Sequence, residues 1–118
     1  MRQTVLIVDD HPSFRASARA ILESEGFEVV GEAADGAAAI AAVDDLGPEV
    51  VLLDVQLPDM TGFDVCGVLE RRNGSTPAVV LVSSRDVSDY GDLIAASCAR
   101  GFVPKAELSG EAVAALLA

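Results

Sequence analysis

Three aspartates in this sequence directly follow short apolar segments. Asp9 and Asp10 come after residues 4–8 (TVLIV), and Asp54 comes after residues 50–53 (VVLL). A charge at the end of a segment suited to a core is costly unless it is paired or binds a cation. Two carboxylates about 4 Å apart, at an effective dielectric constant of about 20, repel by about 4 kcal/mol. Because oxygen ligands without a His or Cys cluster favour a hard cation, these residues indicate a Mg²⁺ site if the fold brings them together.

A hydroxyl and an ammonium group follow two further apolar segments. Ser83 comes after residues 78–82 (AVVLV), and Lys105 comes after residues 101–104 (GFVP). Alone, Ser83 would be interpreted as a helix cap and Lys105 as a solvated surface residue. Together with an aspartate and a divalent cation, they supply the charge and hydrogen bonds that stabilise a transferring phosphoryl group. The combination therefore points to phosphoryl chemistry, provided that all these segments end at one place.

Five segments are expected to be β-strands. Three of them are continuous apolar runs without polar alternation: residues 4–8, 50–53 and 78–82. Such runs are typical of central parallel strands that are covered on both faces. Residues 27–33 carry Glu28 and Glu32, and residues 101–104 end in Pro104. Charges and proline favour the edge of a sheet, so these two segments are predicted to be edge strands.

Helical segments alternate with the strands. Apolar residues at helical spacing form five groups: Phe14, Ala18, Ile21 and Leu22; Ile40 and Val43; Cys66 and Leu69; Tyr90, Ile94 and Cys98; Val113, Leu116 and Leu117. The expected boundaries are Pro12 and Gly26 for the first helix, Asp35 and Gly47 for the second, Asn73 and Gly74 for the end of the third, and Ser109 for the start of the fifth. Gly91, inside the fourth helix, costs about 1 kcal/mol relative to Ala.

The alternation predicts an α/β fold in one domain, residues 1–118. Strands that alternate with helices form a parallel sheet covered on both faces, with right-handed crossovers. Placing the two edge strands gives a doubly wound, five-stranded sheet in the order 2-1-3-4-5. In that order the winding reverses between strands one and three, and ligands bind there, beyond the carboxyl ends of the strands. The three aspartates are therefore expected to meet at this switch point.

Composition and charge exclude several classes of protein. The net charge is −11, with 8 basic and 19 acidic residues, so direct nucleic-acid binding is not expected. No apolar stretch approaches the roughly 20 residues that span a membrane. The amino-terminal MRQTVLIVDD reaches carboxylates too soon for a secretory signal. Cys66 and Cys98 lie far apart without metal-ligand spacing, so both are expected to be reduced and partly buried, as in a cytoplasmic protein.

Four motifs together resemble the receiver domain of two-component response regulators. They are VDD at 8–10, LLDVQLPDMTG at 52–62, Ser83, and GFVPK at 101–105. The resemblance covers essentially the whole chain and implies the flavodoxin-like (βα)₅ fold of the chemotaxis regulator. It also implies a phosphorylation-dependent signalling switch. Such a domain is not an enzyme, although it assists its own phosphorylation and dephosphorylation.

The resemblance assigns the acidic residues to phosphoryl transfer and to Mg²⁺. Asp54 would accept a phosphoryl group from the phosphohistidine of a histidine kinase or a phosphotransfer protein. Asp10 and Asp54 would ligate Mg²⁺ together with the backbone carbonyl of Gln56. Asp9 would act through a metal-bound water.

The remaining implied residues connect the phosphoryl group to a conformational change. Lys105 would pair with one phosphoryl oxygen, and Ser83 would move to donate a hydrogen bond to another. Phe102 matches the switch aromatic of the family, although it could also be an ordinary core aromatic. The change would be felt at the face formed by strand four, helix four and strand five. It would control the binding of a partner, the formation of a homodimer, or a DNA-binding output domain outside this chain.

Some residues depart from the family pattern. Ser83 replaces the commoner threonine, and Pro104 precedes Lys105 where many receivers have a proline after the lysine. A cis bond before Ala106 would cost about 2.5–4 kcal/mol, so Lys105–Ala106 is expected to be trans. Gln56 and Arg85 occupy positions that tune dephosphorylation in the family. His11 is not expected to be a metal ligand, because no second His or Cys lies nearby.

Two other functions remain to be weighed. The chain could be a receiver-like interaction module that signals without phosphorylation. Such modules usually lack at least one residue of a set of five that is complete here: Asp9, Asp10, Asp54, Ser83 and Lys105. It could also be an aspartyl-phosphate phosphatase of the haloacid-dehalogenase class. Those enzymes place a DxD motif after the first strand, whereas residues 8–11 here are VDDH.

Overall fold

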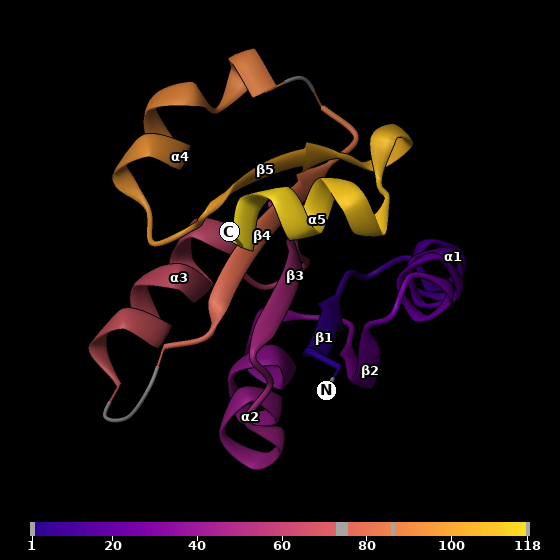
Figure 1. Ribbon diagram of the computed structural model, residues 1–118. Helices are drawn as coiled ribbons and strands as arrows, with labels where there is room; N and C mark the ends of the chain where they lie inside the picture. Colours follow the sequence, from indigo (N-terminus) through magenta and orange to yellow (C-terminus); the bar gives the residue numbers. More distant parts are fainter. Residues whose placement is uncertain (1, 73–75, 86, 118) are drawn as a thin grey trace.

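Five parallel strands form one sheet in the order β2-β1-β3-β4-β5 (Figure 1). The strands are β1 (Thr4–Val8), β2 (Glu28–Ala33), β3 (Val50–Asp54), β4 (Ala78–Ser83) and β5 (Gly101–Pro104). The computed structural model describes residues 2–72, 76–85 and 87–117. The predicted doubly wound order is confirmed, as are the two edge strands.

Helices cover both faces of the sheet (Figure 1). They are α1 (Pro12–Ser24), α2 (Gly36–Leu46), α3 (Gly62–Arg71), α4 (Gly91–Ala96) and α5 (Gly110–Leu117). Two short 3₁₀ helices, Val87–Asp89 and Lys105–Glu107, follow β4 and β5. Helices α1 and α5 pack on one face, and α2, α3 and α4 pack on the other. No helix in the described part of the chain is long and apolar enough to cross a membrane.

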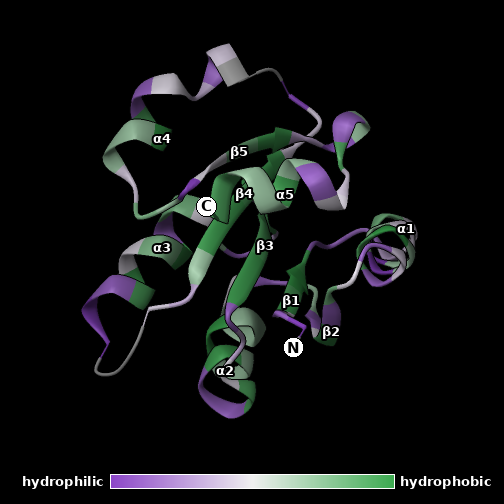
Figure 2. Ribbon diagram, in the orientation of Figure 1, coloured by the Kyte–Doolittle hydropathy of each residue, from purple (hydrophilic) through white to green (hydrophobic). Residues whose placement is uncertain are grey.

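Each central strand contributes to two cores, because successive side chains point to opposite faces. In β1, Leu6 belongs to the core under α2 and α3, whereas Ile7 belongs to the core under α1 and α5. The same alternation holds for Leu53 and Leu52 in β3. This two-sided burial explains the continuous apolar runs, and Figure 2 shows the inner strands as the most hydrophobic part of the chain.

Local signals set most helix boundaries. Asp35 caps α2 by accepting a hydrogen bond from the Ala38 N–H (2.7 Å), and Gly47 ends the helix in the left-handed region at φ 55°. Thr61 forms a capping box with Asp64 at the start of α3. At α5, the Ser109 hydroxyl accepts from the Ala112 N–H (3.0 Å), which confirms the predicted cap.

The fourth helix is shorter than predicted. It covers only Gly91–Ala96, so Tyr90 precedes it and Cys98 follows it. The Ser97 hydroxyl donates to the Ile94 carbonyl (2.8 Å) and accepts from the Ala99 N–H (3.2 Å). Ser side chains that bond the local backbone in this way compete with helix continuation. The predicted end of the third helix, at Asn73 and Gly74, lies outside the described residues.

Candidate functional site

The register of the sheet brings the strand ends to one edge. Val8 pairs with Leu53, Asp54 with Val82, and Ser83 with Pro104. Residues that follow or end neighbouring strands therefore lie side by side. Among the residues that the structure describes, the buried polar or charged ones are Asp9, Asp54 and Ser83. Because buried polar groups normally need partners, their concentration at one edge marks a site.

A carboxylate cluster stands at the switch point between β1 and β3. Ligand atoms of Asp9, Asp10, His11 and Asp54 all lie within 4.8 Å of one another. Asp9 and Asp54 are buried, whereas Asp10 is exposed. Oxygen donors that converge from two strands suit a hard cation such as Mg²⁺. The predicted convergence of the three aspartates is thus observed.

His11 faces the same cluster. Its Nδ1 lies 3.0 Å from Asp9 Oδ1 and 3.2 Å from Asp10 Oδ1, and its side chain is 65% exposed. Its backbone N–H also donates to Asp9 Oδ1 (2.8 Å). These contacts make the imidazole a partner of the two carboxylates.

Lys105 is the cation of the site. Its Nζ lies 2.6 Å from Asp9 Oδ2 and 3.3 Å from Asp54 Oδ2. The same atom lies 4.6 Å from the centre of the Phe14 ring, and the side chain is only 15% exposed. Burial alone would lower the pKa of Lys105, but the two carboxylates outweigh it and raise the pKa. Lys105 therefore stays protonated and links the ends of three strands.

The two buried aspartates respond to this environment in opposite directions. Burial tends to raise the pKa of Asp9, but the Lys105 ammonium and the His11 backbone N–H outweigh it, so the pKa lies below its ordinary value. Burial and the nearby Asp9 charge raise the pKa of Asp54, despite Lys105. Asp9 is therefore the more stable anion, and Asp54 is the carboxylate left short of positive charge. One ammonium among three carboxylates leaves an excess of negative charge that a cation would neutralise.

A hollow of about 230 Å³ opens above this cluster. Its walls include Asp54, Ser83, Lys105 and the β3–α3 loop from Gln56 to Pro58. A carboxylate, a hydroxyl and an ammonium thus border one solvent-accessible space. Such a set can hold and neutralise a phosphoryl group.

The loop after β3 is held in place at several points. The Gln56 N–H donates to Asp54 Oδ1 (3.2 Å). The Asp59 carboxylate accepts from the backbone N–H groups of Gly36 (2.8 Å) and Ala37 (3.0 Å), which ties the loop to the start of α2. A Cβ on Gly62 would lie 2.6 Å from the Asp54 carbonyl oxygen, so only glycine allows α3 to begin this close to the strand end.

Ser83 borders the same hollow as Asp54, and Phe102 lies on the neighbouring strand β5. The Ser83 hydroxyl accepts from the Arg85 N–H (3.0 Å). Phe102 is half-buried on β5, and its ring centre lies 6.3 Å from that of Tyr90. Tyr90 in turn lies 5.9 Å from Phe63, and its buried hydroxyl has no hydrogen-bond partner among the described residues. No peptide bond in the described chain is cis, so Lys105–Ala106 is trans as predicted.

The supporting contacts of three residues had not been predicted. Arg15 donates from Nη1 to the Asp9 carbonyl (2.6 Å) and from Nε to Glu32 (3.0 Å). Phe14 lies under the Lys105 ammonium, and Asp59 anchors the β3–α3 loop. Periodicity had identified Phe14 only as an apolar helix residue, and Arg15 carries no motif. Their roles depend on how α1 packs across the edge of the sheet.

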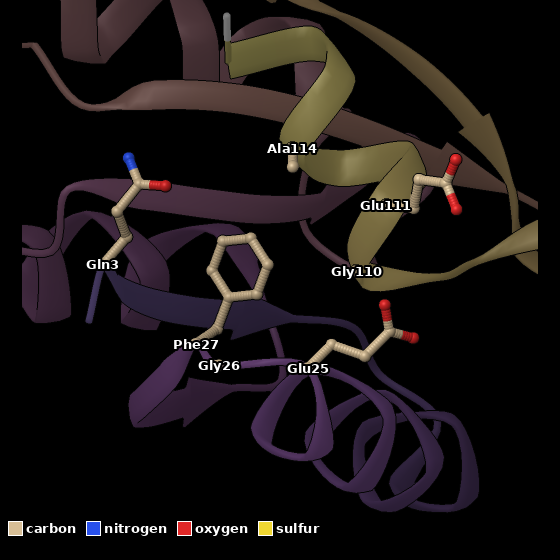
Figure 3. A pocket seen from close by; sticks show the side chains of 7 residues that line it. All are labelled: Gln3, Glu25, Gly26, Phe27, Gly110, Glu111 and Ala114. Carbon is tan, nitrogen blue, oxygen red and sulfur yellow. The ribbon is translucent and has the colours of Figure 1, made fainter. Parts of the chain in front are cut away.

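A larger hollow, of about 320 Å³, lies away from this site between the end of α1 and the start of α5 (Figure 3). Figure 3 shows Glu25 and Glu111 on either side of Gly110, with the Phe27 ring between Gln3 and Gly110. None of the predicted site residues lines this hollow. Size alone therefore does not locate the chemistry of this domain.

The fold and site define a doubly wound α/β domain with an acidic cluster and a lysine at the switch point. The family model for the response regulator receiver domain matches residues 5–117. The chain therefore belongs to the response regulator receiver domain family, which confirms the resemblance. Receiver domains are phosphoacceptors of two-component signalling and not catalysts.

Curated relatives are longer proteins. The chain is 45% identical over 91 residues to the DNA-binding response regulator MtrA of Mycolicibacterium smegmatis, a match that covers 75% of this chain and 38% of that protein. It is 34% identical over 111 residues to the DNA-binding transcriptional activator EvgA of Escherichia coli, covering 94% of this chain and 54% of EvgA. The chain thus spans about half or less of the length of these relatives.

Solved structures show the same architecture. The signal receiver domain of the response regulator NarL from Mycobacterium tuberculosis is 34% identical, with a TM-score of 0.85, over 98% of this chain and 94% of that chain. A CheY-like receiver domain from Methylobacillus flagellatus has a TM-score of 0.86 at 24% identity, over 99% of this chain and 97% of that chain, and shows the fold alone.

Proposed function

We propose that this domain is a phosphorylation-dependent signalling switch that accepts a phosphoryl group on Asp54. The main support is the burial of Asp9, Asp54 and Ser83 at one sheet edge beside the Lys105 ammonium. A surface built only for solubility or docking would not need to bury these polar and charged groups. The family match supports a histidine kinase or a phosphotransfer protein as the donor.

In the proposed transfer, an Asp54 carboxylate oxygen attacks the phosphorus of a phosphohistidine. The phosphorus–nitrogen bond breaks, and the imidazole leaves with the electron pair. The raised pKa of Asp54 makes its carboxylate more basic than that of an exposed aspartate. Lys105, already 3.3 Å from Asp54 Oδ2, is placed to neutralise a phosphoryl oxygen. Ser83, on the neighbouring strand, would give up its contact with the Arg85 N–H and donate to another oxygen.

Mg²⁺ fits the same residues. Asp10, Asp54 and the Gln56 backbone carbonyl would hold the ion, and Asp9 would act through a bound water. When bound, the cation would offset the repulsion among the carboxylates and the charge of the incoming phosphoryl group. Asp9 and Lys105 orient each other through their 2.6 Å contact, and Arg15 fixes the Asp9 backbone by its 2.6 Å hydrogen bond.

The new charge would change the conformation of the β4–α4–β5 face. An aspartyl phosphate adds about −1.5 to −2 charges that Ser83 and Lys105 must meet. Helix α4 has no buried residue in the structure, so moving it costs little packing. Phe102 packs against Tyr90, the residue directly before α4, and Phe102 would turn inward as Ser83 moves. To change the ratio of active to inactive conformation from 1:99 to 99:1, the phosphoryl group must favour the active conformation by about 5.5 kcal/mol.

We further propose that the domain, residues 1–118, acts in the cytoplasm, as response regulators typically do, as part of a longer regulator. Its DNA-binding relatives extend well beyond the region that it matches. A DNA-binding output domain outside this chain, or a homodimer that forms on phosphorylation, would carry the signal. With a net charge of −11 the domain itself would not bind nucleic acid.

The test is phosphorylation by acetyl phosphate in Mg²⁺, followed by intact mass and peptide mapping. We expect one added phosphoryl group in the wild type, none in Asp54→Asn, and none when EDTA replaces Mg²⁺. Amide exchange of residues 87–98 should change with the phosphoryl group. No mass gain in a folded wild type, or an equal gain in Asp54→Asn, would overturn the proposal. It would favour the alternative of a receiver-like module that signals without phosphorylation.

A further inference from the structure

The two cysteines of the chain lie next to each other in the fold. Cys66 is on α3 and is 1% exposed, within the core under α2 and α3. Cys98 lies in the connection between α4 and β5, is half-buried, and packs against the same core. Its Sγ lies 3.8 Å from the Cys66 carbonyl oxygen, to which the Cys98 thiol donates. Both are free thiols in this structure.

The two thiols differ in reactivity. The neighbouring Cys66 thiol lowers the pKa of Cys98, whereas Cys98 and burial raise the pKa of Cys66. Because the thiolate is the nucleophile, an accessible thiol with a lowered pKa reacts first. Cys98 is also the more exposed of the two. The pair therefore has the arrangement of an attacking thiol with a second thiol beside it.

We propose that Cys98 and Cys66 form a reversible intramolecular disulfide when the domain meets a hydroperoxide. The Cys98 thiolate attacks one peroxide oxygen, the O–O bond breaks, and the other oxygen leaves as an alcohol or water after taking a proton. The sulfenic acid on Cys98 is then attacked by the Cys66 sulfur. The S–O bond breaks, and water leaves with the Cys66 proton. Two thiols and one hydroperoxide thus give one disulfide, one water and one alcohol or second water.

The crosslink would act on a segment that is only partly fixed by packing. Helix α4 has six residues and none is buried, although Ile94 packs against the core under α2 and α3. The disulfide would fasten the α4–β5 connection to α3 and restrain it. This restraint requires no phosphorylation, so the inference stands apart from the proposed function. Oxidation would reduce amide exchange in residues 91–100 and leave α1 unchanged.

The test is oxidation of the 118-residue chain by hydrogen peroxide, followed by acid quench, denaturation and maleimide labelling. Tryptic cleavage after Arg19, Arg71, Arg85 and Arg100 places the cysteines on separate peptides, 20–71 and 86–100. We expect both thiols to be lost together and a linked 20–71/86–100 peptide to form in the monomer. A dithiol should reverse both changes. Peptide mapping distinguishes the disulfide from oxidation of Met60, which also lies on the 20–71 peptide.

Two variants check the order of the steps. Cys66→Ala should stop at an oxygenated Cys98 that a dimedone probe captures. Cys98→Ala should leave the buried Cys66 largely unreacted at peroxide levels that exhaust the wild type. The proposal is overturned if the wild type accumulates sulfinate on Cys98 with Cys66 free, links only between molecules, or keeps both thiols. The wild-type result decides even if a variant fails to fold.

Discussion

Replacing Lys105 by Met tests how charge is balanced in the site. The change removes the ammonium but keeps an apolar chain of similar length against Phe14. Without it, Asp9 and Asp54 remain buried near each other with no cation between them. We expect Lys105→Met to lower the free energy of unfolding strongly in metal-free buffer.

The expected loss follows from the two contacts of Nζ. At an effective dielectric constant of about 20, charges 2.6 Å and 3.3 Å apart attract by about 6 and about 5 kcal/mol. Burial of the ammonium offsets several kcal/mol of this attraction, so the net contribution is smaller. Removing one partner from a buried ion pair typically costs about 3–5 kcal/mol, and we expect a loss in that range. Since domains are stable by only about 5–15 kcal/mol, the effect is easily measured.

The pH dependence separates charge from packing. The folded pKa of Asp9 is lowered, so its contribution is present above the ordinary value near 3.8 and is lost as the pH falls through the folded value. In the variant this contribution is largely gone, and protonation of either of the two unpaired carboxylates stabilises the folded state. The stability difference between wild type and variant should therefore be largest near neutral pH and should shrink on acidification. Lys105 itself stays protonated over this range, because its pKa is raised.

Urea unfolding followed by circular dichroism in EDTA, at about pH 7.5 and about pH 5, measures both effects. Arg19→Met is the matched control, since Arg19 pairs with Glu32 at 2.9 Å but is 37% exposed. This surface pair should contribute less than about 1 kcal/mol. A Lys105→Met loss that equals the control, or one that is the same at both pH values, would refute the charge-balance reasoning.

Three further predictions concern the same site. Asp54→Asn should raise the free energy of unfolding near neutral pH without metal. The pKa of Asp54 is raised in the folded state, so ionisation of this carboxyl as the pH rises lowers the free energy of unfolding. A lower free energy of unfolding for Asp54→Asn, measured by urea unfolding in EDTA, would contradict this. Gly62→Ala should destabilise by about 1–3 kcal/mol, because its Cβ would meet the Asp54 carbonyl at 2.6 Å, and should slow phosphorylation by acetyl phosphate; unchanged melting and rate would exclude the clash. Arg15→Met should weaken Mg²⁺ binding, measured by calorimetry, because the Asp9 backbone loses its 2.6 Å hydrogen bond; unchanged affinity would show that this contact does not position Asp9.

Some predictions succeeded because their signals are local or repetitive. Val-rich runs without polar alternation indicated strands buried on both faces, and Glu28, Glu32 and Pro104 indicated edges. Caps at Asp35 and Ser109 fixed two helix starts. The fourth helix was predicted too long, because apolar spacing at Tyr90, Ile94 and Cys98 ignored the competing backbone hydrogen bonds of Ser97.

The sequence by itself determined the fold class, the strand order and the set of polar residues at the strand ends. These follow from periodicity and from the chain direction of parallel strands, which places all carboxyl ends at one edge. Only the tertiary structure decided how the charges pair. The contacts of Lys105 with two aspartates, of Arg15 with the Asp9 carbonyl, and of Cys98 with Cys66 join residues far apart or otherwise unmarked in the chain. They depend on how helices and loops pack across the sheet, and no local pattern encodes that geometry.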